Sequence, residues 1–429
     1  MKPGSVLYPG YPFSGFPVFV YHGERTTFAF LFLACFALFL LYRQRLLSNK
    51  RHLFISILLL FVSFDIRYHF LDIASADYTI FLHRWVEHYQ NTGGFRGLGV
   101  LYENCNYNLP YLYFMALFSY IPQNDLHLIK LLSIFFDLLL AWASMRIVGV
   151  FRDGVRVRLS AFFAVFLLPT VMINSAYWGQ CDSIYVSLAF LGLYHTLRNH
   201  PSRAVIFMAL SFSFKLQAVF LLPVLAVAWM ADRLKFRHLL LFPLTYLAAI
   251  FPGVLMGRPF GEAVFFYLTM QDTGGSSLSR NATNLASFFR IPQDRLGISV
   301  FIFVGLAAVF VLIVLAVCLV KRHRITDRTI LLVSFLFILG IPFFLPRMND
   351  RYFYGAEILS LVIAFVFASY TISFPFVLEL SALNVYANFL WRAYMFPLLY
   401  GTAAFIPVLA SAVVFFFRSF EEVPSARPA

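Results

Sequence analysis

Uninterrupted runs of apolar residues recur along the whole chain and are separated by short polar segments. The strands of a membrane barrel would alternate apolar and polar positions, so these continuous runs favour helices. A helix crosses the hydrocarbon core of a bilayer with about 17–25 residues. The pattern predicts an all-α polytopic membrane protein with about 12–13 transmembrane helices. The expected spans cover approximately residues 26–42, 53–66, 128–151, 159–174, 184–198, 203–214, 217–231, 238–256, 297–320, 329–346, 354–371, 374–392 and 400–417.

Basic residues gather in short loops between these spans. Segments 43–52, 152–158, 232–237 and 321–328 are basic, and the positive-inside rule places such loops in the cytoplasm. All four lie on one side only if residues 110–121 do not cross the membrane. That run is too short to span the bilayer as a helix. We therefore expect an interfacial or re-entrant helix on the outer side there.

This topology predicts one transmembrane domain over residues 1–429 with two large outer loops. Residues 65–127 would form an outer-face subdomain that contains interfacial helices. Residues 257–296 would form a second outer loop, rich in Gly, Ser and Asn, that could act as a lid. Asn281 in this loop begins an Asn-Ala-Thr triplet, which is a formal glycosylation sequon.

The composition agrees with a membrane protein. Hydrophobic residues make up 61% of the chain, charged residues 12%, and the mean hydropathy is +0.79, which is more apolar surface than a soluble core could hide. The net charge of +13 does not indicate a nucleic-acid partner, because the basic residues follow the loops between spans. The N-terminal segment lacks the basic, apolar and small-residue pattern of a cleaved signal peptide. The cysteines show no metal-ligand spacing, although a Cys105–Cys181 disulfide could form.

The stretch 65–113 is the most polar part of the chain. It holds three Asp, two Glu, three Arg and three His among its aromatic residues. Other polar clusters occur at 174–183, at Lys215 and at 347–352, and the predicted topology puts them all on the outer face. A carboxylate such as Asp77 that faces fixed cations suits transfer of a group from a phosphate to a hydroxyl. The carboxylate would accept the hydroxyl proton, and the cations would stabilise charge on the departing phosphate.

Each of these groups also has a purely structural interpretation. Asp77 could pair with Arg84 on a solvated helix. Lys215 could extend its ammonium to the lipid headgroups, and Arg347 and Arg351 could bind lipid phosphates without specificity. The tryptophans and tyrosines could act only as interfacial anchors.

Two other functions are compatible with polar groups in a membrane protein. A transporter, or a flippase for polyprenol-linked glycans, would distribute its charges at mid-membrane and show inverted repeats. The charges here lie mostly at one face, and no repeat is detected. A membrane acyltransferase would need a histidine base, for which His69, His83 and His88 are candidates. Asp137, inside a predicted span, is expected to make a helix–helix contact and no catalytic one.

The polar clusters lie within six motifs between about residues 75 and 360. They are SADYTIFLHRW, YNLPYLYFMALFSYIP, NSAYWGQCDSIY, SFKLQAVFLLPVL, NATNL and LPRMNDRYFY. In content and order these motifs resemble the GT-C superfamily of polytopic glycosyltransferases. The resemblance is closest to bacterial membrane proteins related to the eukaryotic enzyme that adds the second mannose to GPI anchors. The specific part is WGQxDS followed by FKLQAxFLLP. The resemblance implies a GT-C-like helical fold with its active site on the outer face.

The resemblance also implies an inverting glycosyltransferase that moves one hexose, such as mannose or glucose, from a polyprenyl-phosphate sugar donor. The acceptor would be a hydroxyl of a lipid-linked or cell-envelope glycan, and membrane lipids would be the remaining partners. Asp77 would be the catalytic aspartate, and Lys215, Arg347 and Arg351 would bind the donor phosphate. The residues expected to contact the sugar or the acceptor are Tyr78, Arg84, Trp85, Tyr107, Asn108, Tyr111, Trp178, Gln180, Asp182, Gln217, Asn284, Asp350 and Tyr352.

The chain departs from the family pattern at two motifs. Asn349 stands where related sequences carry a histidine, and Asn108-Leu109-Pro110 replaces the usual Asn-Pro-Pro or Asn-Tyr-Pro. No set of protein metal ligands is evident, although a divalent ion such as Mg or Mn could assist. Short loops favour a bacterial cytoplasmic membrane, with the active site facing the periplasm or exterior, over the endoplasmic reticulum.

Overall fold

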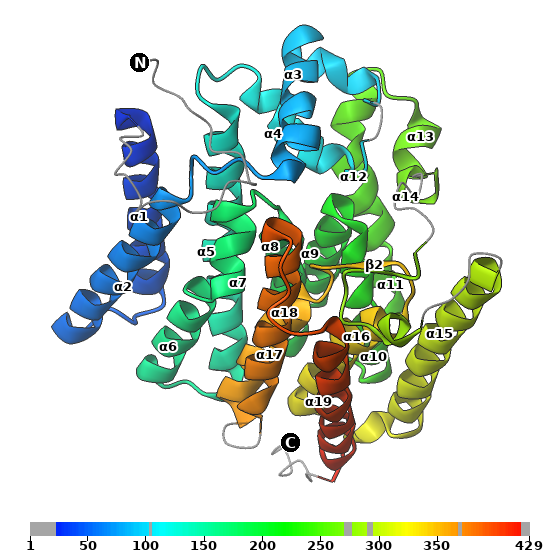
Figure 1. Cartoon of the computed structure of the whole chain (residues 1–429). Coiled ribbons are helices and arrows are strands. Elements are labelled where there is room, and N and C mark those ends of the chain that lie inside the picture. The colour runs from blue at the N-terminus through cyan, green and yellow to red at the C-terminus, as the bar shows by residue number, and fades with distance from the viewer. Residues whose placement is uncertain (1–22, 103–104, 270–276, 290–294, 368–370, 422–429) are drawn as a thin grey trace. The chain divides into compact units, whose positions relative to one another are not determined.

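The computed structural model describes residues 23–102, 105–269, 277–289, 295–367 and 371–421. Almost every predicted span forms a helix within a few residues of its expected ends (Figure 1), which confirms an all-α polytopic membrane protein. In chain order the elements are α1 (Glu24–Arg43), α2 (Lys50–His69), η1 (Tyr78–Leu82), α3 (His83–Asn91), η2 (Gly94–Gly99), α4 (Leu109–Phe118), α5 (Asp125–Phe151), α6 (Val155–Phe166), α7 (Pro169–Met172), η3 (Ile173–Tyr177), α8 (Asp182–Leu197), α9 (Pro201–Phe214), η4 (Leu216–Phe220), α10 (Pro223–Met230), α11 (Phe236–Leu239), α12 (Leu241–Leu255), α13 (Phe260–Val264), α14 (Phe266–Thr269), β1 (Ser279–Arg280), η5 (Leu285–Phe288), α15 (Leu296–Val320), η7 (Arg322–Arg324), α16 (Asp327–Phe344), β2 (Met348–Asn349), α17 (Tyr354–Phe367), α18 (Ser373–Trp391) and α19 (Leu398–Arg418).

Seven helical segments of the described residues are long and apolar enough to cross a membrane. An eighth span is formed if α6 and the segment Pro169–Tyr177, which are bent by 47° at their junction, count together. Several other expected spans form shorter apolar helices, such as α9 and α17. The expected count of about 12–13 spans therefore stays a prediction, since length decides whether one helix can cross.

The chain divides into two compact units by its internal contacts. The first unit comprises residues 1–187, 213–215 and 247–270, and the second comprises residues 188–212, 216–246 and 271–429. The single-domain arrangement predicted from the sequence stays a prediction. The expected lid, 257–296, contains segments 270–276 and 290–294, which lie outside the described residues, as does most of the N-terminal segment.

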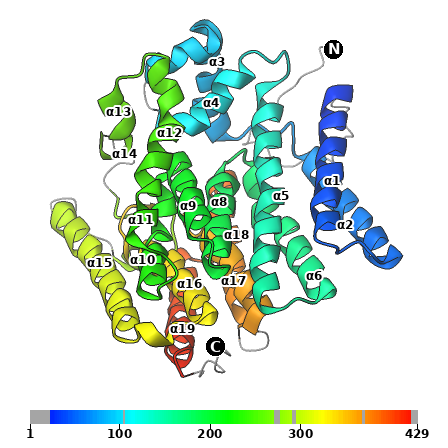
Figure 2. The same ribbon diagram turned by 180° about the vertical axis from the view of Figure 1, so that it is seen from behind.

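In the first unit, α1, α2, α5 and α6 pack side by side (Figures 1 and 2). A buried ion pair joins two of these helices: Arg67 Nη2 of α2 lies 2.9 Å from Asp137 Oδ2 of α5. Arg67 also donates to the carbonyl of Phe166, and Asp137 accepts from the hydroxyls of Ser175 and Ser183. This confirms the expectation that Asp137 makes a helix–helix contact. The pair joins the C-terminal end of α2 to the middle of α5, and the predicted outer segment connects these two helices.

The helix α4 corresponds to the short apolar run at 110–121. Asn108 caps its N-terminus, because its side chain accepts from the backbone N–H of Leu109 at 2.8 Å, and Pro110 occupies the first turn, where a missing N–H costs nothing. Ten residues give a length of about 15 Å, half the hydrocarbon thickness. A short helix was predicted here, and its placement at the interface stays a prediction.

In the second unit, α16 packs against α15, α17 and α19, and α18 packs against α17 and α19. A short parallel pair joins two distant motifs, because Ser279 pairs with Met348 and Arg280 with Asn349. This pairing brings the NATNL and LPRMNDRYFY motifs together. Arg347 adopts a left-handed backbone (φ 58°) beside it and donates its N–H to the carbonyl of Leu278 at 2.6 Å.

Candidate active site

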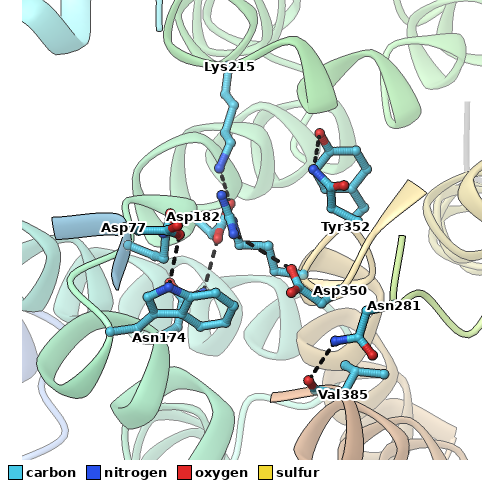
Figure 3. Close-up of polar contacts among 12 residues, drawn as sticks. Asp77, Asn174, Asp182, Lys215, Asn281, Asp350, Tyr352 and Val385 are labelled. Atoms are coloured by element: carbon cyan, nitrogen blue, oxygen red, sulfur yellow. Dashed lines mark hydrogen bonds and ion pairs between the residues drawn. The ribbon is translucent and has the colours of Figure 1, made fainter. Parts of the chain in front are cut away.

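The carboxylate of Asp77 is the centre of a polar cluster in the first unit (Figure 3). Its Oδ2 atom accepts two side-chain hydrogen bonds, from Trp178 Nε1 at 3.0 Å and from Gln180 Nε2 at 2.5 Å. Both donors come from the WGQCDS motif. Hydrogen bonds to a carboxylate favour its ionised form and fix its orientation. The half-buried Asp77 carboxylate is thus oriented by residues that lie about a hundred positions later in the chain.

A buried lysine positions the loop that delivers Asp77. Lys130 Nζ, on α5, donates to the backbone carbonyls of Phe70, Leu71 and Ile73 at 2.6, 3.1 and 2.7 Å. These carbonyls follow the end of α2, where no helical donors remain for them. Lys130 therefore satisfies three acceptors in place of water and anchors the chain just before Asp77.

The two loops of the cluster are also tied directly to each other. Ser75 Oγ donates to the carbonyl of Trp178 at 2.6 Å and accepts from the N–H of Tyr78 at 3.1 Å. Residues 78–82 and 173–177 are π-helical, a rare geometry that recurs at functional sites. Gly179 has φ +79°, and a Cβ there would lie 3.9 Å from the Lys130 side chain. The left-handed backbone and not crowding therefore favours glycine at the turn that separates Trp178 from Gln180.

Asp182 and Lys215 form a buried ion pair beside the same loop (Figure 3). Lys215 Nζ lies 2.5 Å from Asp182 Oδ1, and Asn174 Nδ2 donates to Asp182 Oδ2 at 3.0 Å. Asp182 is 1% exposed and Lys215 is 8% exposed. Lys215 therefore does not extend to the lipid headgroups. Two charges can stay buried here because each compensates the other.

Aromatic rings surround this ion pair. Lys215 Nζ lies 5.3 Å from the ring centroid of Tyr107 and 5.6 Å from that of Tyr185, within cation–π distance. Tyr107 stacks obliquely on Trp85 and Tyr111, with centroids 5.3 and 4.8 Å away. The tyrosine hydroxyl of residue 107 reaches Gln180 Oε1 at 3.5 Å. Tyr107 and Tyr111, which were predicted to contact the sugar or the acceptor, thus lie beside the charged cluster.

The tryptophans of the site are not interfacial anchors. Trp85 is 2% exposed and Trp178 is fully buried. Arg84 is exposed on α3, and no hydrogen bond or ion pair joins it to Asp77 among the described residues. This removes the interpretation of Asp77 as one half of a surface ion pair, and Arg84 is not brought to the cluster by any contact that the structure describes.

Tyr78 has a different partner from the one its predicted role requires. Its hydroxyl donates to Asp125 Oδ1 at 2.9 Å, and His83 Nδ1 lies 2.8 Å from the other oxygen of the same carboxylate. Burial, and then the negative charge of Asp125, raise the pKa of Tyr78. In this structure Tyr78 therefore links the first outer segment to the start of α5, and a sugar contact by its hydroxyl would require that bond to open.

The Cys105–Cys181 disulfide, which the sequence left open, is not formed. Cys105 is a buried free thiol, and its Sγ donates to the carbonyl of Tyr107 at 3.6 Å. Burial raises the pKa of Cys105 to about 12, so the thiol is neutral at physiological pH. A neutral, buried thiol is a packing group with little nucleophilic reactivity.

The second unit holds the remaining predicted residues. Arg351 Nη1 lies 3.6 Å from Asp350 Oδ1, and both side chains are largely buried. Asn349 Nδ2 donates to the hydroxyl of Tyr352 at 3.1 Å (Figure 3). Asn284 Nδ2 donates to the carbonyl of Leu345. These contacts hold the LPRMNDRYFY motif in one compact turn. Because this group and the Asp77 cluster belong to different units, a single site built from both stays a prediction.

Asn281 belongs to a hydrogen-bond network that sequence reasoning did not find. Its Nδ2 donates to the carbonyl of Val385 at 2.9 Å, and its Oδ1 accepts from Asn388 Nδ2 and from the hydroxyl of Tyr394 (Figure 3). The amide nitrogen of this sequon is therefore engaged within the protein and is not presented for glycosylation. The network connects the NATNL motif to α18 and the turn after it.

Gln217 was predicted to contact the sugar or the acceptor, and Lys130 was not predicted at all. Gln217 follows Lys215 in the chain, and its half-buried side chain has an Oε1 atom without a hydrogen-bond partner among the described residues. Lys130 was not predicted as a positioning residue, although an ionisable side chain inside a predicted span is a recognised signal of a functional or structural role.

The described residues offer little support for a protein-held metal ion or for a histidine base. Within the described ranges no three His, Cys, Asp or Glu side chains gather in a way that could hold a metal. If a divalent ion assists the reaction, it would take most of its ligands from substrate phosphate and water, as Mg²⁺ often does. His83 is an exposed partner of Asp125, and His69 is paired with Asp65 on the same helix turn. Burial lowers the pKa of His88, which packs against aromatic rings.

Comparison of the chain with models of protein families gives no match, and comparison with curated proteins gives none either.

Proposed function

We propose that this protein is an inverting glycosyltransferase that uses a polyprenyl-phosphate sugar as donor, with Asp77 as the general base. The observation that supports this best is the half-buried Asp77 carboxylate, which Trp178 and Gln180 orient by hydrogen bonds. Asp182, which follows Gln180 by two residues, forms a buried ion pair with Lys215. The cluster therefore combines an oriented base with a buried cation in a protein built from membrane-spanning helices.

The proposed reaction is a single displacement at the anomeric carbon. The acceptor hydroxyl oxygen forms the new bond to that carbon, the bond from the carbon to the donor phosphate oxygen breaks, and its electron pair leaves on the phosphate. The hydroxyl proton passes to Asp77 as the bond forms. Attack from the face opposite the phosphate inverts the configuration of the sugar. Polyprenyl phosphate is the second product.

This step does not require a strong base. The hydroxyl becomes acidic only as its oxygen bonds to an electron-poor, oxocarbenium-like carbon. A base that stays ionised and correctly oriented until that moment is then sufficient, and general-base catalysis of this kind contributes about 10²–10⁴ in rate. Trp178 and Gln180 would supply that ionised, oriented state.

The leaving phosphate requires a positive charge. Lys215 offers an ammonium with three donors, one of which is directed to Asp182. We propose that Asp182 keeps Lys215 buried and charged, and that Lys215 donates to the departing phosphate with its other protons. Arg347 and Arg351 stay the residues that the motif resemblance predicts for fork-shaped contacts to a donor phosphate.

A transfer assay tests this function. Purified protein in neutral detergent is supplied with a panel of polyprenyl-phosphate hexoses and a glycolipid acceptor, and release of polyprenyl phosphate is measured together with the sugar-bearing product. A glycosyltransferase forms both in equal amounts from at least one donor. A flippase or transporter would move donor or acceptor across a vesicle membrane and release no polyprenyl phosphate.

A further inference from the structure

A cavity of about 170 Å³ lies within the first unit, between α4 and the short helices α13 and α14. Leu109 and Leu112 line it from α4, and Ala263 and Phe266 line it from α13 and α14. Pockets for complete small ligands usually measure about 300–1,000 Å³. This cavity is therefore large enough for a compact chemical group but not for a whole lipid or an oligosaccharide.

A buried arginine is the main polar group of this cavity. Arg258 is 4% exposed, and its Nε donates to the carbonyl of Leu98 at 3.0 Å. Its Nη2 atom is buried without a hydrogen-bond partner among the described residues, and no ion pair engages its guanidinium there. An uncompensated buried cation costs several kcal/mol, roughly, unless another group supplies the missing charge. Burial lowers the pKa of Arg258, and the negative charge of Glu262 acts in the opposite direction.

The backbone around Arg258 fixes the guanidinium in place. A Cβ atom on Gly99 would lie 2.6 Å from the carbonyl oxygen of Met256, so the two segments approach each other as closely as glycine allows. Gly257 has φ +107°, a conformation that favours glycine. Arg258 is thus held by its backbone and its Nε, while its buried Nη2 atom has no hydrogen-bond partner among the described residues.

The surroundings of the cavity indicate a lipid as the source of that ligand. Arg258 follows the candidate span Phe236–Leu255 by three residues, which is the level of the lipid headgroups. Phe260 on α13, Phe265 between the two helices and Leu268 on α14 are 57%, 55% and 83% exposed. Short helices with an apolar exposed face beside a span lie in the membrane interface. Acyl chains can cover this face while a headgroup enters the cavity.

We propose that this cavity binds the phosphate of a membrane lipid, with Arg258 as its anchoring cation. A phosphate supplies two or more acceptors for the guanidinium fork and the missing negative charge. Its lipid tails lie against the apolar face of α13 and α14. This site is distinct from the Asp182–Lys215 pair, and its existence does not require that the protein transfers sugars.

Two further residues that line the cavity, Glu262 and Tyr107, affect what a bound phosphate would do there. Glu262 lines the cavity without forming an ion pair with Arg258 among the described residues, and it is exposed. Its negative charge opposes a bound phosphate and limits the affinity. Tyr107 lines the same cavity and reaches Gln180, a partner of Asp77. A lipid phosphate held at Arg258 would therefore lie one aromatic side chain away from the candidate base.

The test is a titration of full-length protein in neutral detergent with fluorescent phosphatidic acid, without any sugar donor. Arg258→Gln should weaken binding about tenfold or more, since one charge-assisted contact is lost. Glu262→Gln should tighten binding several-fold, because a repulsive charge is removed. Arg96→Gln, at an exposed arginine on the adjacent η2, is the matched control and should leave binding unchanged.

Displacement of the fluorescent probe by unlabelled competitors shows whether the cavity requires both the phosphate and the tails of the lipid. Excess diacylglycerol, which has tails but no phosphate, and millimolar inorganic phosphate, which has no tails, should each fail to displace the probe. Displacement by either one as efficient as by unlabelled phosphatidic acid would overturn the proposal. If Arg258→Gln does not fold, Ala263→Leu narrows the cavity with Arg258 intact and should also weaken binding. Equal binding by Ala263→Leu and the unmodified protein would contradict the site.

Discussion

The indole Nε1 of Trp178 donates a 3.0 Å hydrogen bond to Oδ2 of Asp77 across 101 positions of sequence. A tryptophan nitrogen can only donate, so this contact requires an acceptor at residue 77 and suits an ionised carboxylate best. Gln180 donates to the same oxygen. The carboxylate therefore owes its orientation to side chains of one later loop.

Trp178→Phe keeps the ring but removes one of these donors. A hydrogen bond to a charged group contributes about 1.5–3 kcal/mol, so sugar transfer should fall by about tenfold or more at saturating substrate. Trp142→Phe is the matched control, because the Nε1 of Trp142 is buried without a partner among the described residues. If both variants transfer sugar at the unmodified rate, the Trp178 contact does not support catalysis.

The Asp182–Lys215 pair should behave as a coupled buried unit. Asp182→Asn or Lys215→Met alone leaves one buried charge uncompensated, which typically costs about 3–5 kcal/mol. Both single variants should lower the midpoint of thermal unfolding strongly, and the double variant should recover much of the loss.

An ion pair whose carboxylate is exposed provides the control for this cycle. Asp153, 89% exposed, pairs with Arg158 at 3.2 Å, and Asp153→Asn should shift stability by less than about 1 kcal/mol. Strictly additive effects of the Asp182 and Lys215 changes would show that the two charges are not coupled as the structure describes.

The buried hydroxyl of Tyr113 should make the free energy of unfolding fall at alkaline pH. Its hydroxyl donates to the carbonyls of Ala249 and Ile250 and accepts from the N–H of Gly253, and burial raises the pKa of Tyr113 to about 12. Between its ordinary pKa of about 10 and this value, the folded state binds more protons than the unfolded state. The free energy of unfolding therefore falls as pH rises through this window, and the stabilisation is fully present only below about pH 10.

Unfolding midpoints measured across this alkaline window check the Tyr113 prediction. Tyr113→Phe should flatten the decline, with a loss of about 1 kcal/mol at neutral pH from the missing hydrogen bonds. Tyr42→Phe, at a tyrosine that is 70% exposed, should reproduce the unmodified curve. An unchanged alkaline slope in Tyr113→Phe would contradict the assignment.

Arg351 tests whether the second unit contributes to use of the donor. Arg351→Gln should raise the KM for the polyprenyl-phosphate sugar by about tenfold, as expected for loss of one charge-assisted contact. Arg324→Gln changes an exposed arginine of a basic loop and should leave the KM unaffected. Equal KM values for both variants would exclude Arg351 from the donor site.

The positions of the helices could be predicted from sequence because continuous apolar runs leave few alternatives in a membrane. The grouping of Trp178, Gln180 and Asp77 could be anticipated only through motif resemblance, since hydrophobic periodicity carries no information on which loops meet. The Asp125 contact of Tyr78 and the Val385 contact of Asn281 were not predictable. They depend on side-chain directions at the ends of distant helices, which local sequence does not determine. Lys130 was visible as a charge inside a span, but its three carbonyl partners arise from the loop after α2.

The most direct test of the proposed function is the rate at which Asp77→Asn releases polyprenyl phosphate from the donor that the unmodified protein uses. Asp77→Asn keeps the size of the side chain but removes the base, so the rate should fall at least about a hundredfold with the unfolding midpoint little changed. Asp65→Asn, at a carboxylate whose side chain is 52% exposed, should retain the unmodified rate. A folded Asp77→Asn protein that releases polyprenyl phosphate as fast as the unmodified protein would contradict the assignment of Asp77 as the general base.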